Sequence, residues 1–317
     1  MVKKKLVLHI GTHKTGTSTI QALLGDNRKL LLESGILYPS TDRGPNPKLQ
    51  KHTSLFLSVC QGAGKFSQEY SLIMREFDQS NCSVMVLSAE GFSSPQFKQR
   101  NFHLLKKFSE YFDIKVVCFV RRQDYFMESL WNQNCKNGQQ LSHIVDFLKN
   151  GKNSQRQLYL NSLNFYSEFC DVRVINFDLA VKDGLEKTFA EISGIPIPTS
   201  KRPRNVSPGS SCALTMAAMT KLGLEFNTMS IIEAFKKDKS KFVLGSKLRK
   251  KLLDEMYVHN TRLASGYGII FSDFLPDEGP DPVLEPDQSH VIAALSNLSM
   301  MNAHYSIKAQ REKTKKR

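Results

Sequence analysis

The sequence has no apolar stretch long enough to cross a membrane. A transmembrane helix needs about 20 mostly apolar residues, whereas the longest uninterrupted apolar run is Val116–Val120. The N-terminal lysines resemble the start of a signal peptide, but His9 and Gly11 interrupt the apolar run that follows them. We therefore expect a cytoplasmic protein.

Cysteine is also scarce, and no two cysteines form a C-x-x-C pair. A disulfide framework and a zinc cluster both need closely spaced cysteines, so the sequence argues against both. The chain also contains no internal repeat that would indicate a solenoid. The six cysteines are far apart in the chain, at Cys60, Cys82, Cys118, Cys135, Cys170 and Cys212.

Negative charge is scarce relative to positive charge. The 317 residues include 44 Lys and Arg but only 30 Asp and Glu, which gives a formal net charge of +14. Residues 201–262 carry a net charge of +8 and residues 308–317 a net charge of +5, whereas residues 263–307 contain no Lys or Arg. Such an excess predicts an anionic partner: a nucleotide, a nucleic acid, an acidic glycan or an anionic membrane surface.

Short apolar runs alternate with amphipathic segments over the first two thirds of the chain. The pattern predicts strands at Leu6–Ile10, Val84–Leu87, Lys115–Val120 and Val172–Phe177. Helices are expected at Thr17–Glu33, Phe97–Phe112, Asp124–Lys136, Ser154–Phe169 and Leu185–Ile192. Alternating strands and helices are typical of an α/β fold, in which helices flank a parallel β-sheet.

The character of the sequence changes after Gly194. Ile195–Gly209 contains four prolines, which indicates a loop and a boundary, and the residues beyond it read as helical. We expect three parts: a core at residues 1–209, a mostly helical C-terminal part packed on it at 210–307, and a basic disordered tail at 308–317.

The most informative segment is Leu6–Ile20, where a strand is followed by a Gly/Thr-rich loop and a helix. Loop amides and a helix N-terminus together form an anion site. Two glycines have the separation found in a nucleotide-binding P-loop, but position 17 is threonine and the lysine stands earlier, at Lys14. The anion-binding candidates are Gly11, Thr12, His13, Lys14, Thr15, Gly16, Thr17 and Ser18.

This loop resembles that of sulfotransferases that use 3′-phosphoadenosine 5′-phosphosulfate (PAPS). Their pattern Lys-[Ser/Thr]-Gly-Thr-[Ser/Thr] is matched by Lys14–Ser18, and a second family element, a strand-terminal Arg followed eight residues later by Ser, is matched by Arg121 and Ser129. Residues 5–209 are most similar to bacterial carbohydrate and lipopolysaccharide sulfotransferases. The resemblance implies a P-loop-type parallel sheet, PAPS as co-substrate and no metal. It also implies that Arg121 and Ser129 hold the 3′-phosphate.

A nucleotide-closing loop of the type that cytosolic eukaryotic members carry, Arg-Lys-Gly, is absent. The segment Arg202–Ser207 is its functional counterpart in our interpretation. Its candidates for closure over the nucleotide or for acceptor contact are Arg204, Asn205 and Ser207.

Sulfonate transfer requires stabilisation of the leaving group and removal of a proton from the acceptor. Lys14 is the candidate that meets the developing negative charge. Glu90 is the first candidate for the general base because it follows a predicted strand, at the edge where ligands bind in parallel sheets. His52, in a loop after the first helix, is the second candidate.

Two other functions are weighed against this one. A P-loop kinase accounts for the first loop but not for the Arg121 and Ser129 spacing, and a basic nucleic-acid-binding protein accounts for the charge but not for the loop. As partners we expect an acceptor glycan, a glycolipid or another small hydroxyl compound, with peripheral contact to an anionic membrane surface and no nucleic acid.

Overall fold

The computed structural model describes residues 3–40, 50–94, 99–139, 144–150, 155–197, 209–235 and 243–272. The chain divides into two compact units. The first unit consists of Met1–Arg122, Gln155–Arg204 and Met256–Ser272, and the second of Gln123–Ser154, Asn205–Glu255 and Asp273–Arg317. Among the sequence predictions, the basic tail at 308–317 and the candidates Arg204, Asn205 and Ser207 lie outside the described residues.

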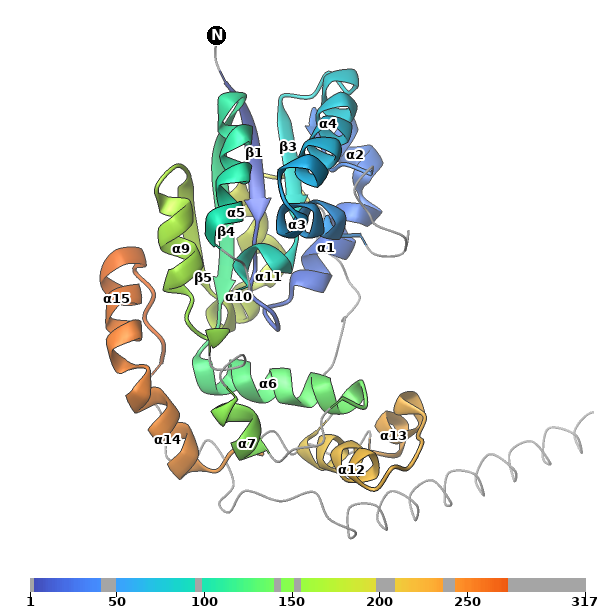
Figure 1. The fold of residues 1–317 in the computed structure, drawn as a ribbon, viewed down its shortest axis with the longest axis vertical. Coiled ribbons are helices and arrows are strands. Elements are labelled where there is room, and N and C mark those ends of the chain that lie inside the picture. Colours follow the sequence, from blue (N-terminus) through green and yellow to red (C-terminus); the bar gives the residue numbers. More distant parts are fainter. Residues whose placement is uncertain are drawn as a thin grey trace, which may run out of the picture. The chain divides into compact units, whose positions relative to one another are not determined.

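A parallel sheet of five strands forms the centre of the first unit (Figure 1). Its strands are β1 (Lys4–His9), β2 (Ile36–Leu37), β3 (Val84–Ser88), β4 (Phe112–Val120) and β5 (Asp171–Asn176). They lie in the order β2-β3-β1-β4-β5, and all neighbouring pairs are parallel. The predicted α/β fold with a parallel sheet flanked by helices is therefore confirmed. The two-residue strand β2 was not predicted, because so short a run gives no periodicity.

Helices cover both faces of this sheet. The first unit contains α1 (Thr17–Asp26), α2 (Arg28–Glu33), α3 (Thr53–Gln61), α4 (Ala63–Gln79), α5 (Gln99–Phe102), α9 (Leu160–Ser167), α10 (Phe177–Asp183), α11 (Leu185–Ser193) and α15 (Tyr257–Tyr267). Two 3₁₀ helices occupy Glu90–Ser93 and His103–Glu110.

Alternate residues of β1 enter two different hydrophobic clusters. Leu6 and Leu8 pack with residues of α3, α4, α9 and α15, whereas Val7 packs with residues of α1, α10 and α11. Because successive side chains of a strand point to opposite faces, these are the cores of the two faces. Each fully buried aliphatic side chain contributes about 1.5–3 kcal/mol, so the two layers hold β1 firmly in place.

Two predicted helices are broken in the structure. The helix expected at Thr17–Glu33 is interrupted at Asn27, whose side-chain amide donates a 2.8 Å hydrogen bond to the Leu23 carbonyl at the end of α1. The helix expected at Phe97–Phe112 is the short α5 followed by a 3₁₀ helix, and Phe112 already belongs to β4. In this segment, the helical spacing of buried aromatic residues therefore reflects their packing in one core. It does not indicate one continuous helix.

The described part of the second unit is helical. It contains α6 (Gln123–Lys136), α7 (Ile144–Lys149), α12 (Ser210–Lys221), α13 (Thr228–Ala234) and α14 (Ser246–Glu255), around a core that includes Trp131 and Met216. The helical character predicted for residues 212–262 is confirmed in their described part. Among the described residues of the whole chain, no helix has the length and apolarity that a membrane span requires.

A fully buried ion cluster joins α14 to α6 in the second unit. The Arg249 guanidinium donates a 2.7 Å hydrogen bond to Asp124 and a further bond to Glu128. Burial raises the pKa of Glu128, and the Arg249 charge together with the backbone N–H groups of Val243 and Leu244 opposes that increase. A buried ion is tolerated only when it is paired in this way.

Candidate functional site

The loop between β1 and α1 continues the sheet before it turns away. The Ile10 N–H donates to the Val117 carbonyl at 3.0 Å, and the Thr12 hydroxyl donates to the Phe119 carbonyl at 2.9 Å. Lys14 and Gly16 then adopt positive φ angles of 63° and 71°. The left-handed turn leads directly into α1, so the loop is anchored to β4 and places backbone amides around the helix N-terminus.

Both glycines of the loop are required by close packing within the protein. A Cβ atom on Gly11 would lie 2.6 Å from the Thr17 methyl group and 2.8 Å from Nε2 of His9. A Cβ on Gly16 would lie 2.4 Å from the Leu185 side chain, at a φ angle that favours glycine. A side chain at Gly11 would therefore displace the loop from α1, and a side chain at Gly16 would displace it from Leu185 of α11.

Some hydroxyl groups of the loop are buried and hydrogen-bonded within the protein, and others are exposed. The Thr15 hydroxyl donates to the Thr12 carbonyl at 2.6 Å, and both residues are buried. Ser18 is exposed in the first turn of α1. Of the predicted hydroxyl donors, Ser18 is the one that faces the surroundings.

Glu90 approaches the loop from the neighbouring strand. It follows β3 as the first residue of a 3₁₀ helix, and the Thr17 hydroxyl donates a hydrogen bond to its Oε1. Its Oε2 lies 3.7 Å from Nδ1 of His13 and 3.8 Å from the Lys51 ammonium. The structure therefore brings together Glu90, the phosphate loop and a lysine, at the carboxyl edge of the sheet.

The charges around this carboxylate are mainly positive. Burial lowers the pKa of the His13 imidazole, and the Glu90 charge opposes the decrease. Three cations lower it further: Arg156, Lys51 and Lys14. Glu90 contacts Lys51, and Lys14 and Arg156 lie near enough to His13 to lower its pKa, so this cluster has more cations than carboxylates and the charge to hold an anionic ligand.

Arg156 is a member of this cluster that the sequence did not reveal. It is half-buried, burial lowers its pKa, and its Nε has no hydrogen-bond partner among the residues that the structure describes. No motif surrounds it, and it reaches the loop from a segment more than a hundred residues later. Only the folded chain shows that it belongs here.

His52 is buried and holds backbone groups with both ring nitrogens. Its Nδ1 accepts a 2.9 Å hydrogen bond from the Ser88 N–H, and its Nε2 lies 3.3 Å from the Pro39 carbonyl, to which it donates. The ring also meets the Tyr38 ring edge-on, at 4.8 Å between centroids. Because both nitrogens are engaged with backbone groups, this geometry favours Glu90 over His52 as the candidate base.

Arg121 stands at the carboxyl end of β4, as expected. Its Nε donates to Asp178 at 3.0 Å, its guanidinium lies 5.3 Å from the Phe177 ring centroid, and its carbonyl accepts a hydrogen bond from Tyr159. Ser129 is a half-buried residue of α6 in the second unit. The joint 3′-phosphate site of Arg121 and Ser129 therefore stays a prediction.

Arg122 is less suited to bind a ligand than its neighbour. Its side chain is buried, and it donates to the backbone and side-chain oxygens of Ser272, both at 3.3 Å. It is thus part of the packing of the first unit, and it does not replace Arg121.

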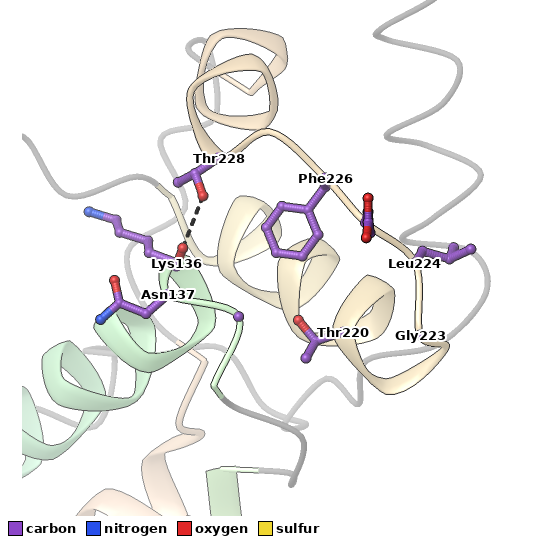
Figure 2. A pocket seen from close by; sticks show the side chains of 9 residues that line it. Lys136, Asn137, Thr220, Gly223, Leu224, Phe226 and Thr228 are labelled. Carbon is purple, nitrogen blue, oxygen red and sulfur yellow. Dashed lines mark hydrogen bonds between the residues drawn. The ribbon is translucent and has the colours of Figure 1, made fainter.

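A hollow of about 500 Å³ lies on the second unit, beside the C-terminal end of α6 (Figure 2). The Thr228 hydroxyl closes one side through a 3.0 Å hydrogen bond to the Lys136 carbonyl, and the Phe226 ring forms an apolar wall. The lining residues are Lys136, Asn137, Gly138, Thr220, Gly223, Leu224, Glu225, Phe226 and Thr228. It combines polar groups with one aromatic ring.

Comparison with known proteins gives similarity at the level of solved structures. No family model and no curated protein matches the chain. A sulfotransferase from Alicyclobacillus acidocaldarius is similar with a TM-score of 0.43 and 12% identity, over 75% of this chain and 98% of that chain. The sulfotransferase domain of the curacin biosynthetic pathway has a TM-score of 0.38 and 11% identity, over 81% and 98%.

A third similar structure comes from the PezAT chromosomal toxin–antitoxin system of Streptococcus pneumoniae. It has a TM-score of 0.27 and 9% identity, over 83% of this chain and 87% of that chain. These likenesses are distant, so the functional argument rests on the residues of the site.

Proposed function

We propose that this protein is a sulfotransferase that moves a sulfonate group from PAPS to a hydroxyl or amine group of an acceptor. A glycan or glycolipid is the acceptor class that the motif resemblance favours. The observation that carries the proposal is the pairing of two features: Lys14 in the left-handed turn of an anion-binding loop, and Glu90 held at that loop by Thr17.

The site suits the phosphosulfate group of PAPS in charge and in shape. Loop amides and the N-terminus of α1 provide N–H donors, and Lys14, Lys51 and Arg156 provide positive charge. Gly11 keeps the loop close against Thr17 of α1, and Gly16 keeps it close against Leu185 of α11, where a side chain would not fit. When bound, PAPS supplies an activated sulfonate group whose leaving group is adenosine 3′,5′-bisphosphate.

In the proposed reaction, Glu90 takes the proton of the acceptor hydroxyl while the acceptor oxygen forms a new bond to sulfur. The bond between sulfur and the 5′-phosphate oxygen breaks, and its electron pair stays on that oxygen. Lys14 and the loop N–H groups stabilise the charge that develops there. Glu90 is suited to this task because it lies at the loop and is 16% exposed, so an acceptor can reach it.

The kinase alternative receives less support from the same residues. A P-loop kinase needs a lysine immediately after the second glycine, where this chain has Thr17, and that hydroxyl is bound to Glu90. Calorimetric titration with adenosine 3′,5′-bisphosphate and with magnesium-ATP separates the two functions. We expect the bisphosphate to bind more tightly, and tight binding of ATP alone would contradict the sulfotransferase proposal.

Activity itself is tested with ³⁵S-labelled PAPS and a panel of glycans, glycolipids and small phenols. We expect transfer to at least one class of hydroxyl compound and none without acceptor. If the wild-type protein binds the bisphosphate but transfers sulfonate to no member of a broad panel, the proposed activity is wrong although the nucleotide site is right.

A further inference from the structure

A buried histidine that the mechanism does not use lies beneath the phosphate loop. His9 is the last residue of β1 and has no exposed surface. The rings of Phe119 and Phe189 meet it edge-on, at 6.0 and 5.4 Å between centroids. Burial lowers its pKa to about 4, so the imidazole is neutral at pH 7.

The hydrogen bonds around His9 determine which ring nitrogen carries its proton. Nδ1 of His9 lies 2.8 Å from the Ser88 hydroxyl oxygen, which also accepts a 3.2 Å hydrogen bond from the Gln21 amide. The Ser88 hydroxyl also has a hydrogen to donate, and among the described residues Nδ1 of His9 is the acceptor that lies within hydrogen-bond distance of it. Nδ1 is then an acceptor, and the single ring hydrogen is on Nε2.

The protonated Nε2 faces the start of the phosphate loop. It lies 2.8 Å from the point where Gly11 would carry a Cβ, and the Thr17 methyl lies 2.6 Å from the same point. It has no hydrogen-bond partner among the residues that the structure describes. An unsatisfied buried donor costs about 1–3 kcal/mol, so a folded protein keeps one only where something compensates for it.

His9 is connected to the catalytic carboxylate by two routes. Its carbonyl accepts a 3.1 Å hydrogen bond from the N–H of Ala89, the residue before Glu90. Its ring packs against the Gly11 backbone and so against Thr17, whose hydroxyl holds Glu90. A change in the ring is therefore transmitted both to the loop and to Glu90.

We propose that His9 is a positioning residue of the phosphate loop. It acts through Gly11 and Thr17, and the hydrogen bond of its Nε2–H is completed by an oxygen atom that the anion-bound loop brings to it. The inference rests on the proposed function only in requiring that the loop bind an anion.

Two substitutions test the roles of the two ring nitrogens of His9 separately. His9→Gln keeps an N–H near the place of Nε2, and His9→Asn keeps an amide near the place of Nδ1. We expect His9→Gln to bind adenosine 3′,5′-bisphosphate within about twofold of wild type, and His9→Asn to bind it up to about 12-fold more weakly, as the net loss of one hydrogen bond predicts. Equal affinities, or weaker binding by His9→Gln than by His9→Asn, would overturn the proposal.

Nuclear magnetic resonance of the ¹⁵N-histidine-labelled wild-type protein keeps the test valid if either variant fails to fold. We expect a protonated Nε2, an unprotonated Nδ1, and a shift of the Nε2–H resonance on saturation with the bisphosphate. A proton on Nδ1, or an unchanged resonance at saturation, overturns the inference.

The proposed function can fail separately from this inference. If the wild-type protein binds no bisphosphate, the sulfotransferase proposal fails, and the same titration with inorganic pyrophosphate then tests the loop. A shift of the Nε2–H resonance with pyrophosphate supports the inference, whereas an unchanged resonance, or no binding of either anion, overturns it.

Discussion

The two units of this protein each contain a cluster of arginine or lysine with carboxylates, and the two clusters differ in completeness. In the second unit, Arg249 donates hydrogen bonds to both Asp124 and Glu128, and backbone N–H groups donate to the other Glu128 oxygen, so this buried cluster of one cation and two carboxylates is satisfied by hydrogen bonds. In the first unit, the Glu90 carboxylate is 16% exposed, its Oε2 lies 3.7 Å from His13 and 3.8 Å from Lys51, and Lys14 and Arg156 add positive charge around His13.

This difference shows how a structural ion cluster is told from a binding site. A buried cluster must satisfy its charged groups by pairing and hydrogen bonds within the protein, because an uncompensated ion in the interior costs several kcal/mol. The cluster around Glu90 has more positive than negative charge, and Nε of Arg156 has no hydrogen-bond partner among the described residues. Under the proposed function, the ligand supplies the missing negative charge.

Removing the carboxylate of the incomplete cluster gives the largest expected effect on activity. Glu90→Gln should lower kcat about 10²–10⁴-fold, since the general base is lost. Binding of adenosine 3′,5′-bisphosphate, measured by calorimetry, should change little. The matched variant is His52→Ala, which should lower the free energy of unfolding because it frees two backbone groups, but should retain more of kcat than Glu90→Gln. The reverse ranking in kcat would identify His52 as the base.

Breaking the complete cluster should affect stability instead of chemistry. Arg249→Met leaves Asp124 and Glu128 buried without their cation, which should lower the free energy of unfolding by about 3–5 kcal/mol in urea titrations. Arg173→Met is the control, because Arg173 is 60% exposed and pairs with Asp171 at the surface. Equal losses in the two variants would show that the buried cluster contributes no more than a surface ion pair.

A substitution at Lys14 tests whether its positive charge stabilises the transition state. Lys14→Ala should lower kcat/KM about 10²–10³-fold, the range for loss of one preorganised group that stabilises developing charge. The free energy of unfolding should stay close to that of wild type, because Lys14 is only partly buried. Lys29→Ala, which removes an exposed lysine on α2, is the control for net charge. Near-native activity of Lys14→Ala would remove Lys14 from the site.

Features that are local in the chain were predictable, and those that join distant segments were not. The strand, loop and helix around Lys14 occupy consecutive residues, and Glu90 follows a visible strand, so both were found from the sequence. Arg156 has no motif around it, and the contact between His9 and Ser88 spans 79 residues. The backbone contacts of His52 were not predictable for a similar reason, because a loop histidine in the sequence gives no indication of which backbone groups it will bind.

The last comparison has the smallest expected effect and concerns His9, beneath the loop. It compares the ionisable wild-type histidine with a glutamine at the same position, which carries no charge. The pKa of His9 is about 4 in the folded protein and 6.5 ordinarily. Between these values the unfolded chain binds more protons, so the stability of the wild type decreases as the pH falls below about 6.5. The nearby Glu90 charge favours the protonated ring but does not outweigh burial.

The His9→Gln variant has no imidazole to protonate, so it lacks this loss of stability at low pH. From pH 7.5 to 4.5, the free energy of unfolding of the wild type should therefore decrease by about 2–3 kcal/mol more than that of His9→Gln. Urea titrations of both proteins at the two pH values measure the difference, and other titrating groups cancel because the two chains share them. A difference that does not change with pH would mean that His9 is not held neutral by burial. The assignment of its hydrogen to Nε2, which assumes a neutral ring, would then fail as well.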